Sequence, residues 1–171
     1  MKVIGISGSP RRGGNTEILL QHSLEPFKER NWIVVEFYVS QHTVLPCDGC
    51  DNCVHSAECV LDDDMTLLFN EFENFDAMIV ASPTYYRNVT AQLKAVIDRT
   101  YALTNTHRLQ GKLGGAITVG RGEGGGQSLT LSIIHNFFLS FGMICVPGEL
   151  NGVSARADKV GDIRSQPKRL Q

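Results

Sequence analysis

Short apolar runs alternate with helical patterns along most of this chain, and this alternation limits the possible folds more than any other feature. The apolar runs have the length of β-strands and lie at residues 2–7, 32–39, 76–82, 113–120 and 143–147. The segments between them carry apolar residues at helical spacing, at residues 16–30, 62–75, 90–103 and 127–141. Strands joined through helices pair in parallel, and right-handed crossovers place helices on both faces of the sheet. The sequence therefore predicts a doubly wound α/β domain with five parallel strands.

The composition agrees with one domain of this kind. The chain has 171 residues, 42% of them hydrophobic, so we expect residues 1–171 to form a single domain around one core. A net charge of -2 does not indicate the concentration of positive charge that nucleic-acid-binding proteins carry. The sequence has no signal-peptide pattern and no run of about 18 apolar residues, which predicts a cytoplasmic protein without a membrane span. Residues 151–171 are polar and weakly patterned, which predicts a loop or a short helix.

Three loops are expected at the carboxyl edge of the sheet, where open α/β sheets bind their ligands. The first, SGSPRRGGNTE at residues 7–17, combines Ser, Asn and Thr side chains, two arginines and a helix N-terminus, which suit a monophosphate. It is not a Walker loop, because Gly13 is followed by Gly14 and not by lysine. For Thr16, helix capping is an equally good explanation.

The other two loops suit a flat ring. The loop after the third strand, SPTYYRNVTAQLK, has two adjacent tyrosines, whose rings can stack on an aromatic ligand. The loop GRGEGGGQ, at residues 120–127, has five glycines in eight residues, which permit close approach of main-chain N–H groups to a ligand.

The segments GSPRRGGNT and SPTYYRNVTAQLKAVIDR, and GGGQ before a long helix, resemble in order and spacing the flavodoxin-like NAD(P)H-dependent FMN reductase superfamily over roughly residues 1–150. The resemblance implies strand order 2-1-3-4-5 and FMN as the cofactor. The residues implied to hold the FMN phosphate are Ser7, Ser9, Arg11, Asn15 and Thr16. Those implied to line or cover the ring and the ribityl chain are Pro83, Thr84, Tyr85, Tyr86, Asn88, Gly120 and Gly122. Redox chemistry then belongs to the cofactor, and no acid–base catalytic residue is required.

Four of the five cysteines lie within thirteen residues, in the segment CDGCDNCVHSAEC. A reducing cytosol and an odd total disfavour a disulfide framework, so we expect metal or redox chemistry. Three cysteines at intervals of three residues can each reach a different iron of one small cluster, and a fourth beyond a short excursion can reach the last. The spacing favours a [4Fe-4S] cluster, while structural zinc and free thiols stay open as alternatives. The expected ligands are Cys47, Cys50, Cys53 and Cys59.

Together with the flavin loops, this quartet narrows the resemblance to the iron-sulfur flavoproteins of anaerobic microbes. Their cysteine motif interrupts a flavodoxin-like domain after its second strand, as the cysteine-rich loop at residues 46–60 does in this chain. The resemblance implies a flavin-dependent oxidoreductase with one FMN and one [4Fe-4S] cluster per chain. It also implies a ferredoxin-like electron donor, a small-molecule acceptor such as oxygen or peroxide, and a homodimer or homotetramer.

Two other functions stay open at this point. One is a NAD(P)H-dependent FMN or quinone reductase without a cluster, and the other is a zinc-stabilised or thiol-sensing binding protein on the same scaffold. A further hypothesis concerns the assembly. The second strand lies at the sheet edge, whereas FMN occupies the crevice between strands one and three, so each cluster would serve the flavin of a neighbouring subunit.

Overall fold

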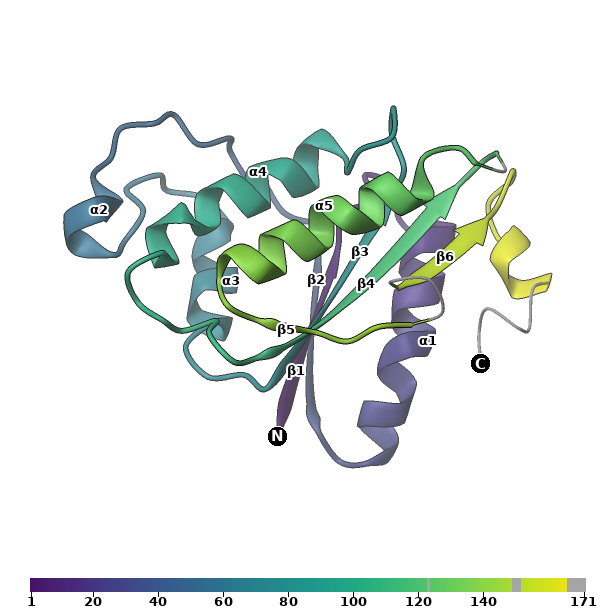
Figure 1. The fold of residues 1–171 in the computed structure, drawn as a ribbon, viewed down its shortest axis with the longest axis horizontal. Helices are drawn as coiled ribbons and strands as arrows, with labels where there is room; N and C mark the ends of the chain where they lie inside the picture. Colours follow the sequence, from purple (N-terminus) through teal and green to yellow (C-terminus); the bar gives the residue numbers. More distant parts are fainter. Residues whose placement is uncertain (123, 149–151, 166–171) are drawn as a thin grey trace.

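A parallel β-sheet forms the centre of the molecule (Figure 1). The computed structural model describes residues 1–122, 124–148 and 152–165. The strands are β1 (Lys2–Ser7), β2 (Ile33–Tyr38), β3 (Ala77–Pro83), β4 (Leu113–Gly120), β5 (Ile144–Cys145) and β6 (Val153–Arg156). Their order is β2-β1-β3-β4-β5, with β6 also paired to β4, and these pairs are parallel. The predicted doubly wound fold and its strand order are therefore confirmed.

The outermost position beside β4 is shared by two short strands, where a single fifth strand was expected. β5 pairs with Leu113 and Gly114 at the start of β4, and β6 pairs with Ile117 to Gly120 at its end. Pro147 has no backbone N–H to donate to a ladder, so the apolar run cannot continue its pairing there. β6 falls in the segment expected to be a loop or a short helix. Only Ala155 of its four side chains is fully buried, which is too little pattern for a strand to be recognised.

Helices cover both faces of the sheet. The helical elements are α1 (Asn15–Glu29), α2 (Cys53–Ser56), α3 (Met65–Glu71), α4 (Ala91–Arg99), η1 (Thr100–Leu103), α5 (Gln127–Ser140) and η2 (Asp162–Ser165). α1 and η2 lie on one face, and α3, α4 and α5 lie on the other (Figure 1). Within the described ranges, no helix is both long enough and apolar enough to span a bilayer.

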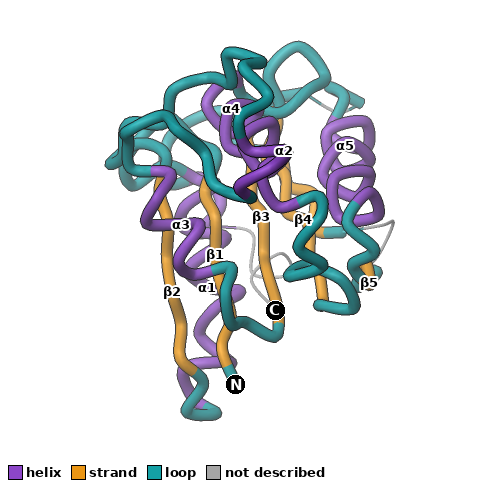
Figure 2. Tube along the Cα trace, turned by 90° about the vertical axis from the view of Figure 1, so that its left-hand side faces the viewer, coloured by secondary structure: helices purple, strands orange, loops and turns teal. Residues whose placement is uncertain are grey.

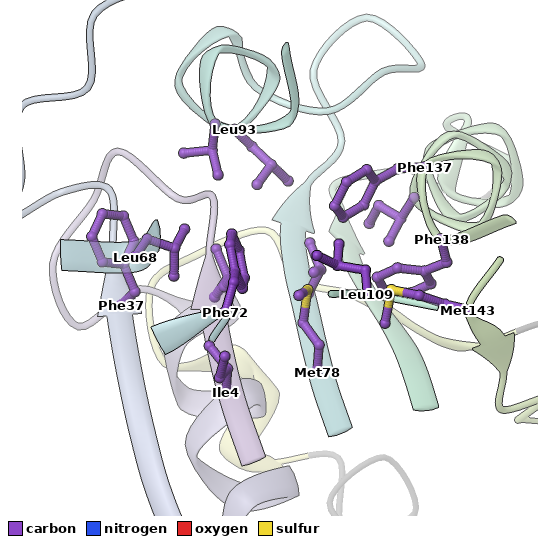
Figure 3. Packing of buried hydrophobic residues seen from close by; sticks show 14 of the residues in the cluster. Ile4, Phe37, Leu68, Phe72, Met78, Leu93, Leu109, Phe137, Phe138 and Met143 are labelled. Carbon is purple, nitrogen blue, oxygen red and sulfur yellow. The ribbon is translucent and has the colours of Figure 1, made fainter. Parts of the chain in front are cut away.

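Two cores separate the sheet from these helices. In the larger core, Phe72, Met78 and Phe138 pack between the sheet and the helices α3 to α5 (Figure 3). In the smaller core, Leu24 of α1 and Ile163 of η2 are completely buried against the opposite face. Alternate residues of each central strand therefore enter opposite cores, as expected for a sheet that is covered on both sides.

α4 connects the two regions where the sequence predicts function. At its start, Thr90 Oγ1 accepts a hydrogen bond from the Leu93 N–H (3.1 Å) and donates one to the Gly8 carbonyl of the phosphate loop (2.6 Å). At its end, the Arg99 side chain is 1% exposed and lies beside the cysteine-rich loop. A helix of nine residues is about 14 Å long. The phosphate loop and the cysteine-rich loop therefore lie at opposite ends of one short, packed helix.

Candidate functional site

The three predicted loops meet at the carboxyl edge of the strands, where Figure 2 shows loops gathered above the sheet. They enclose a cavity of about 260 Å³. Its lining includes most of the residues implied to bind FMN, namely Ser9, Arg11, Asn15, Thr16, Pro83, Thr84, Tyr85 and Gly120. Ser7, Tyr86, Asn88 and Gly122, which carry the same expectation, do not line it. The structure thus brings the three loops together around one hollow, with a core of the expected residues facing it.

The phosphate loop is held in shape by its own hydrogen bonds. Ser9 Oγ accepts from the Arg11 N–H (3.1 Å), and the buried Ser7 Oγ accepts from the Ser9 N–H (3.4 Å). Gly13 has φ of +63°, and its N–H donates to the buried carboxylate of Glu17 (2.6 Å). Within the described chain no side chain caps α1, so Thr16 is not its cap, and Gly14, Asn15 and Thr16 at the start of the helix line the cavity. Such a helix start is an anion-binding position.

Asn15 has a different set of partners from the phosphate role that the resemblance implies. Its side-chain Nδ2 donates to the Lys159 carbonyl (2.7 Å), and its Oδ1 accepts from the N–H groups of Gly161 (2.8 Å) and Ile163 (3.4 Å). These bonds fasten the segment after β6 to the phosphate loop. As a result, residues 157–160 form a fourth wall of the cavity and bring Lys159 to it. Sequence reasoning missed this wall, because residues 157–160 are half-buried or exposed and, between residues 157 and 165, Ile163 is the one buried apolar residue.

The loop after β3 contains a tight turn in an unusual conformation. The backbones of Tyr85 and Asn88 exchange two hydrogen bonds (2.9 and 3.0 Å), and the two residues between them have positive φ, +48° for Tyr86 and +64° for Arg87. Such turns favour Asn and Gly, so Tyr and Arg are strained here. Tyr86 is fully exposed and does not line the cavity that Tyr85 lines. Asn88 Oδ1 accepts from the Val89 N–H (2.8 Å), a local bond inside the turn.

The glycine-rich loop is closed by one glutamine. Gln127 Nε2 donates to the Gly122 carbonyl (2.9 Å). A Cβ at Gly120 would lie only 2.5 Å from this nitrogen, so a larger residue there would displace the Gln127 side chain. The Gly122 carbonyl thus takes part in shaping the loop beside Gly120, and the expected position of Gly122 over a ring stays a prediction.

All four clustered cysteines line a second and larger cavity of about 630 Å³. Cys47 and Cys50 are exposed, and Cys53 and Cys59 are half-buried. The opposite wall comes from the ends of α4 and α5 and from η1, with Arg99, Tyr101, Phe137 and Phe141. The loop contains little regular structure, since α2 spans only Cys53–Ser56. The fifth cysteine, Cys145, lies apart in β5, and burial raises the pKa of its thiol.

The donor chemistry of this cavity fits a polynuclear iron-sulfur group. Burial raises the pKa of the Cys53 thiol, and the charges of Cys59, Cys47 and Cys50 raise it further. Four thiols around one cavity can serve as ligands of a shared metal group once they lose their protons, and the cation then stabilises the thiolates. Among residues 1–122, 124–148 and 152–165, no three His, Cys, Asp or Glu side chains are grouped as ligands of one metal ion. An iron-sulfur cluster does not require its ligands to converge on one ion, because each cysteine binds a different iron.

A buried ion pair that sequence reasoning missed lies directly behind the cysteines. Arg99 and Asp63 side chains are 1% and 2% exposed, and they form two hydrogen bonds of 2.7 and 3.1 Å. Burial acts to raise the pKa of Asp63, but the hydrogen bonds from Arg99 and from two backbone N–H groups outweigh it and hold that pKa below its usual value. A signal was present. Leu93, Val96 and Arg99 are spaced by three on α4, so the arginine continues the apolar side of the helix.

Comparisons with known proteins agree with this arrangement. A family model described as NADPH-dependent FMN reductase matches residues 1–157. An iron-sulfur flavoprotein of Methanocaldococcus jannaschii is 42% identical over 147 residues, which are 85% of this chain and 76% of that protein. An iron-sulfur flavoprotein of Methanosarcina thermophila is 41% identical over 147 residues, 85% of this chain and 77% of that protein.

Solved structures show the same architecture. A flavodoxin from the domain Archaea matches with a TM-score of 0.62 and 18% identity, over 99% of this chain and 93% of that one. At this identity the likeness concerns the fold alone, and the fold is flavodoxin-like.

Proposed function

Since the chain belongs to the NADPH-dependent FMN reductase family, and within it to the iron-sulfur flavoproteins, we propose that it carries electrons between a ferredoxin-like donor, a [4Fe-4S] cluster and FMN and passes them to a small acceptor. Family membership makes it a flavin-dependent oxidoreductase. One observation carries the two-cofactor proposal. The chain has two separate cavities at the two ends of α4, one built from the three flavin loops and the other from four thiols.

For FMN, the proposed phosphate site is the start of α1 with Ser9, Arg11 and Thr16 around it. Arg121 and Lys159 add positive charges to the same cavity, and Asp158 adds a negative one. Tyr85 and the main chain at Gly120 offer surfaces for the ring. Bound FMN supplies the redox chemistry, accepting electrons singly or in pairs. The residues of the cavity orient the cofactor and limit the access of water to it.

For the cluster, the proposed ligands are Cys47, Cys50, Cys53 and Cys59, each of which must lose its thiol proton to bind iron. The buried Arg99 cation beside Cys59 offsets part of the resulting negative charge. A bound cluster supplies one-electron transfer. The aromatic wall at Phe137 and Phe141 would limit the access of solvent to cluster sulfur on one side of the cavity.

The surface charge around the thiols restricts the donor. The exposed acidic residues of this region are Asp48, Asp51, Glu58 and Asp62, and no lysine or arginine lies between residues 46 and 64. These charges repel an acidic surface and attract a basic one. We therefore propose a ferredoxin-like donor whose contacting face is neutral or basic.

We also propose that the protein assembles as a homodimer or homotetramer. Support comes from large apolar side chains on the outside of η1 and α5, where Tyr101 is 50% exposed and Leu139 is 60% exposed. Tyr101 lines the cysteine cavity, and Leu139 precedes Ser140, which also lines it, so a partner subunit seated there would bring its own residues close to the cluster. Sedimentation velocity of the wild type and of Leu139→Glu tests this assembly. A monomeric wild type would contradict it.

The test of the two-cofactor function is the absorption spectrum of anaerobically purified protein, with iron, acid-labile sulfide, zinc and flavin measured on the same sample. Flavin bands over a broad cluster shoulder, with about four irons and four sulfides per chain, are expected for a cubane with four cysteine ligands. Anaerobic reconstitution with iron and sulfide supplies the control for loss during purification. Flavin alone after reconstitution would support the second candidate, a NAD(P)H-dependent reductase, which the description of the matching family favours. Stoichiometric zinc without flavin would support the binding-protein alternative.

A further inference from the structure

We propose that Arg99 is the positioning residue of the cysteine loop. Its guanidinium closes the loop before any metal binds, and its hydrogen bond to Cys59 sets the reduction potential of a cluster held there. The effect on the reduction potential rests on the proposed function, because it requires a bound cluster. The closure of the loop does not, because it concerns the chain without iron.

All five N–H donors of the Arg99 guanidinium have acceptors around the cysteine loop. Nη1 donates to the Leu45 carbonyl (3.0 Å) and to Asp63 Oδ2 (2.7 Å). Nη2 donates to the Leu61 carbonyl (3.4 Å) and to Asp63 Oδ1 (3.1 Å), and Nε donates to Cys59 Sγ (3.1 Å). A lysine ammonium has only three donors and no planar fork, so it cannot reproduce this pattern.

The acceptors stand at both ends of the loop. Leu45 precedes the first clustered cysteine, and Leu61 follows the last. Asp63 adds to the same closure, because its Oδ2 accepts from the Leu45 N–H (2.7 Å) and its Oδ1 accepts from the Met65 N–H (3.0 Å). One buried ion pair thus joins the two ends of the loop that carries all four cysteines. Bringing loop ends together costs conformational entropy, and here the folded protein supplies that closure in advance.

The bond to Cys59 has a separate consequence. Reduction adds one negative charge to a cluster, and part of that charge is carried by the ligand sulfurs. A cationic N–H donor within 3.1 Å of Cys59 Sγ stabilises the reduced form more than the oxidised form. Arg99 therefore raises the reduction potential relative to a chain that lacks the Nε donor.

Arg99 also fixes where the cluster lies relative to the flavin cavity. It is the last residue of α4, and the residue before the helix, Thr90, is bonded to the phosphate loop at Gly8. The arginine is anchored on a packed helix and not on the loop itself, which makes the distance between the cavities a property of the fold.

The test compares full-length wild type with Arg99→Lys, which keeps the charge opposite Asp63. Arg30→Lys is the matched control, since Arg30 lies at the exposed end of α1. In chelator-treated, iron-free protein, limited proteolysis within residues 46–60 is expected to be at least about tenfold faster in Arg99→Lys and unchanged in Arg30→Lys. In reconstituted protein, the cluster of Arg99→Lys should have a more negative potential by about 60 mV, a tenfold change in a one-electron equilibrium. The FMN potential, read from the same titration, should not move.

Equal cleavage rates in iron-free wild type and Arg99→Lys, or equal cluster potentials, would overturn the corresponding half of the inference. Wild type that takes up no iron on reconstitution would reject the two-cofactor function, while the proteolysis of iron-free protein would still decide the role of Arg99. If Arg99→Lys does not fold, Asp63→Asn replaces it. This variant keeps the shape of the side chain and weakens the same fork, so unchanged cleavage of the loop in Asp63→Asn would reject the closure role.

Discussion

The flavin cavity and the cysteine cavity are held in shape by different parts of the structure. The loops of the flavin cavity begin at the ends of central strands. Their residues Ser7, Ser9 and Thr16 are buried, and the hydroxyls of Ser7 and Ser9 accept hydrogen bonds from backbone N–H groups. The cysteine loop leaves the edge strand β2, exposes Cys47 and Cys50, and is fastened at its base by the pair Arg99–Asp63. The sheet thus shapes the first site, whereas one side-chain cluster, and whatever the sulfurs bind, shapes the second.

The largest expected effect is a loss of iron from the cysteine cavity without any loss of FMN from the flavin cavity. Cys50→Ala removes one ligand and should lower the iron content by about tenfold or more, because the remaining thiols cannot complete the cluster. FMN content should stay at the wild-type value, since no cysteine lines the flavin cavity. Metal and flavin analysis of the same preparation measures both, and Cys145→Ala is the control. Loss of FMN together with iron would show that the cavities are coupled and would break the comparison.

The second prediction concerns the base of the cysteine loop. Arg99→Ala leaves the Asp63 carboxylate buried without its partner and should lower the free energy of unfolding by about 3–5 kcal/mol. Arg108→Ala removes an arginine from the exposed pair with Glu73 and should cost about 0–1 kcal/mol. Urea unfolding of both variants without iron gives the difference. Similar losses in the two variants would mean that the Arg99 pair is no stronger than a surface contact.

Much of this comparison was predictable from the sequence, for a physical reason. The strands are apolar on both sides and the main helices are amphipathic, so local pattern reports their burial. The four cysteines lie close together in the sequence, so their grouping is visible without the structure. The helical spacing of Arg99 indicates that it is buried, but its partners at residues 45, 61 and 63 lie 36 or more positions away, and no local pattern identifies such contacts. β6 and the wall at Lys159 were missed because few apolar residues anchor them.

The third prediction sharpens the description of the flavin cavity. Asn15→Ala removes the hydrogen bonds that fasten the segment after β6, and it should weaken FMN binding by about tenfold, since the fourth wall is released. Titration of flavin-free protein with FMN, followed by fluorescence quenching, measures the affinity. Asn105→Ala, at an exposed position in the turn after η1, is the control. Unchanged affinity in Asn15→Ala would show that the three loops that follow strands of the sheet hold FMN without the fourth wall. The flavin cavity would then depend on the sheet even more strongly than the comparison states.

The smallest effect appears only in acid and tests the charge at the base of the loop. The folded-state pKa of Asp63 lies below its usual value, because the bonds from Arg99 and the backbone outweigh burial. An acid with a lowered folded pKa adds stability above its unfolded pKa of about 3.9 and loses that stability as the pH falls toward the folded pKa. The unfolding free energy of iron-free wild type should therefore fall more steeply below about pH 4 than that of Asp63→Asn, while the two curves run parallel near pH 7. Parallel curves throughout would mean that Asp63 titrates as an ordinary surface acid, and then the loop base would owe its order to shape and hydrogen bonding without a contribution from charge.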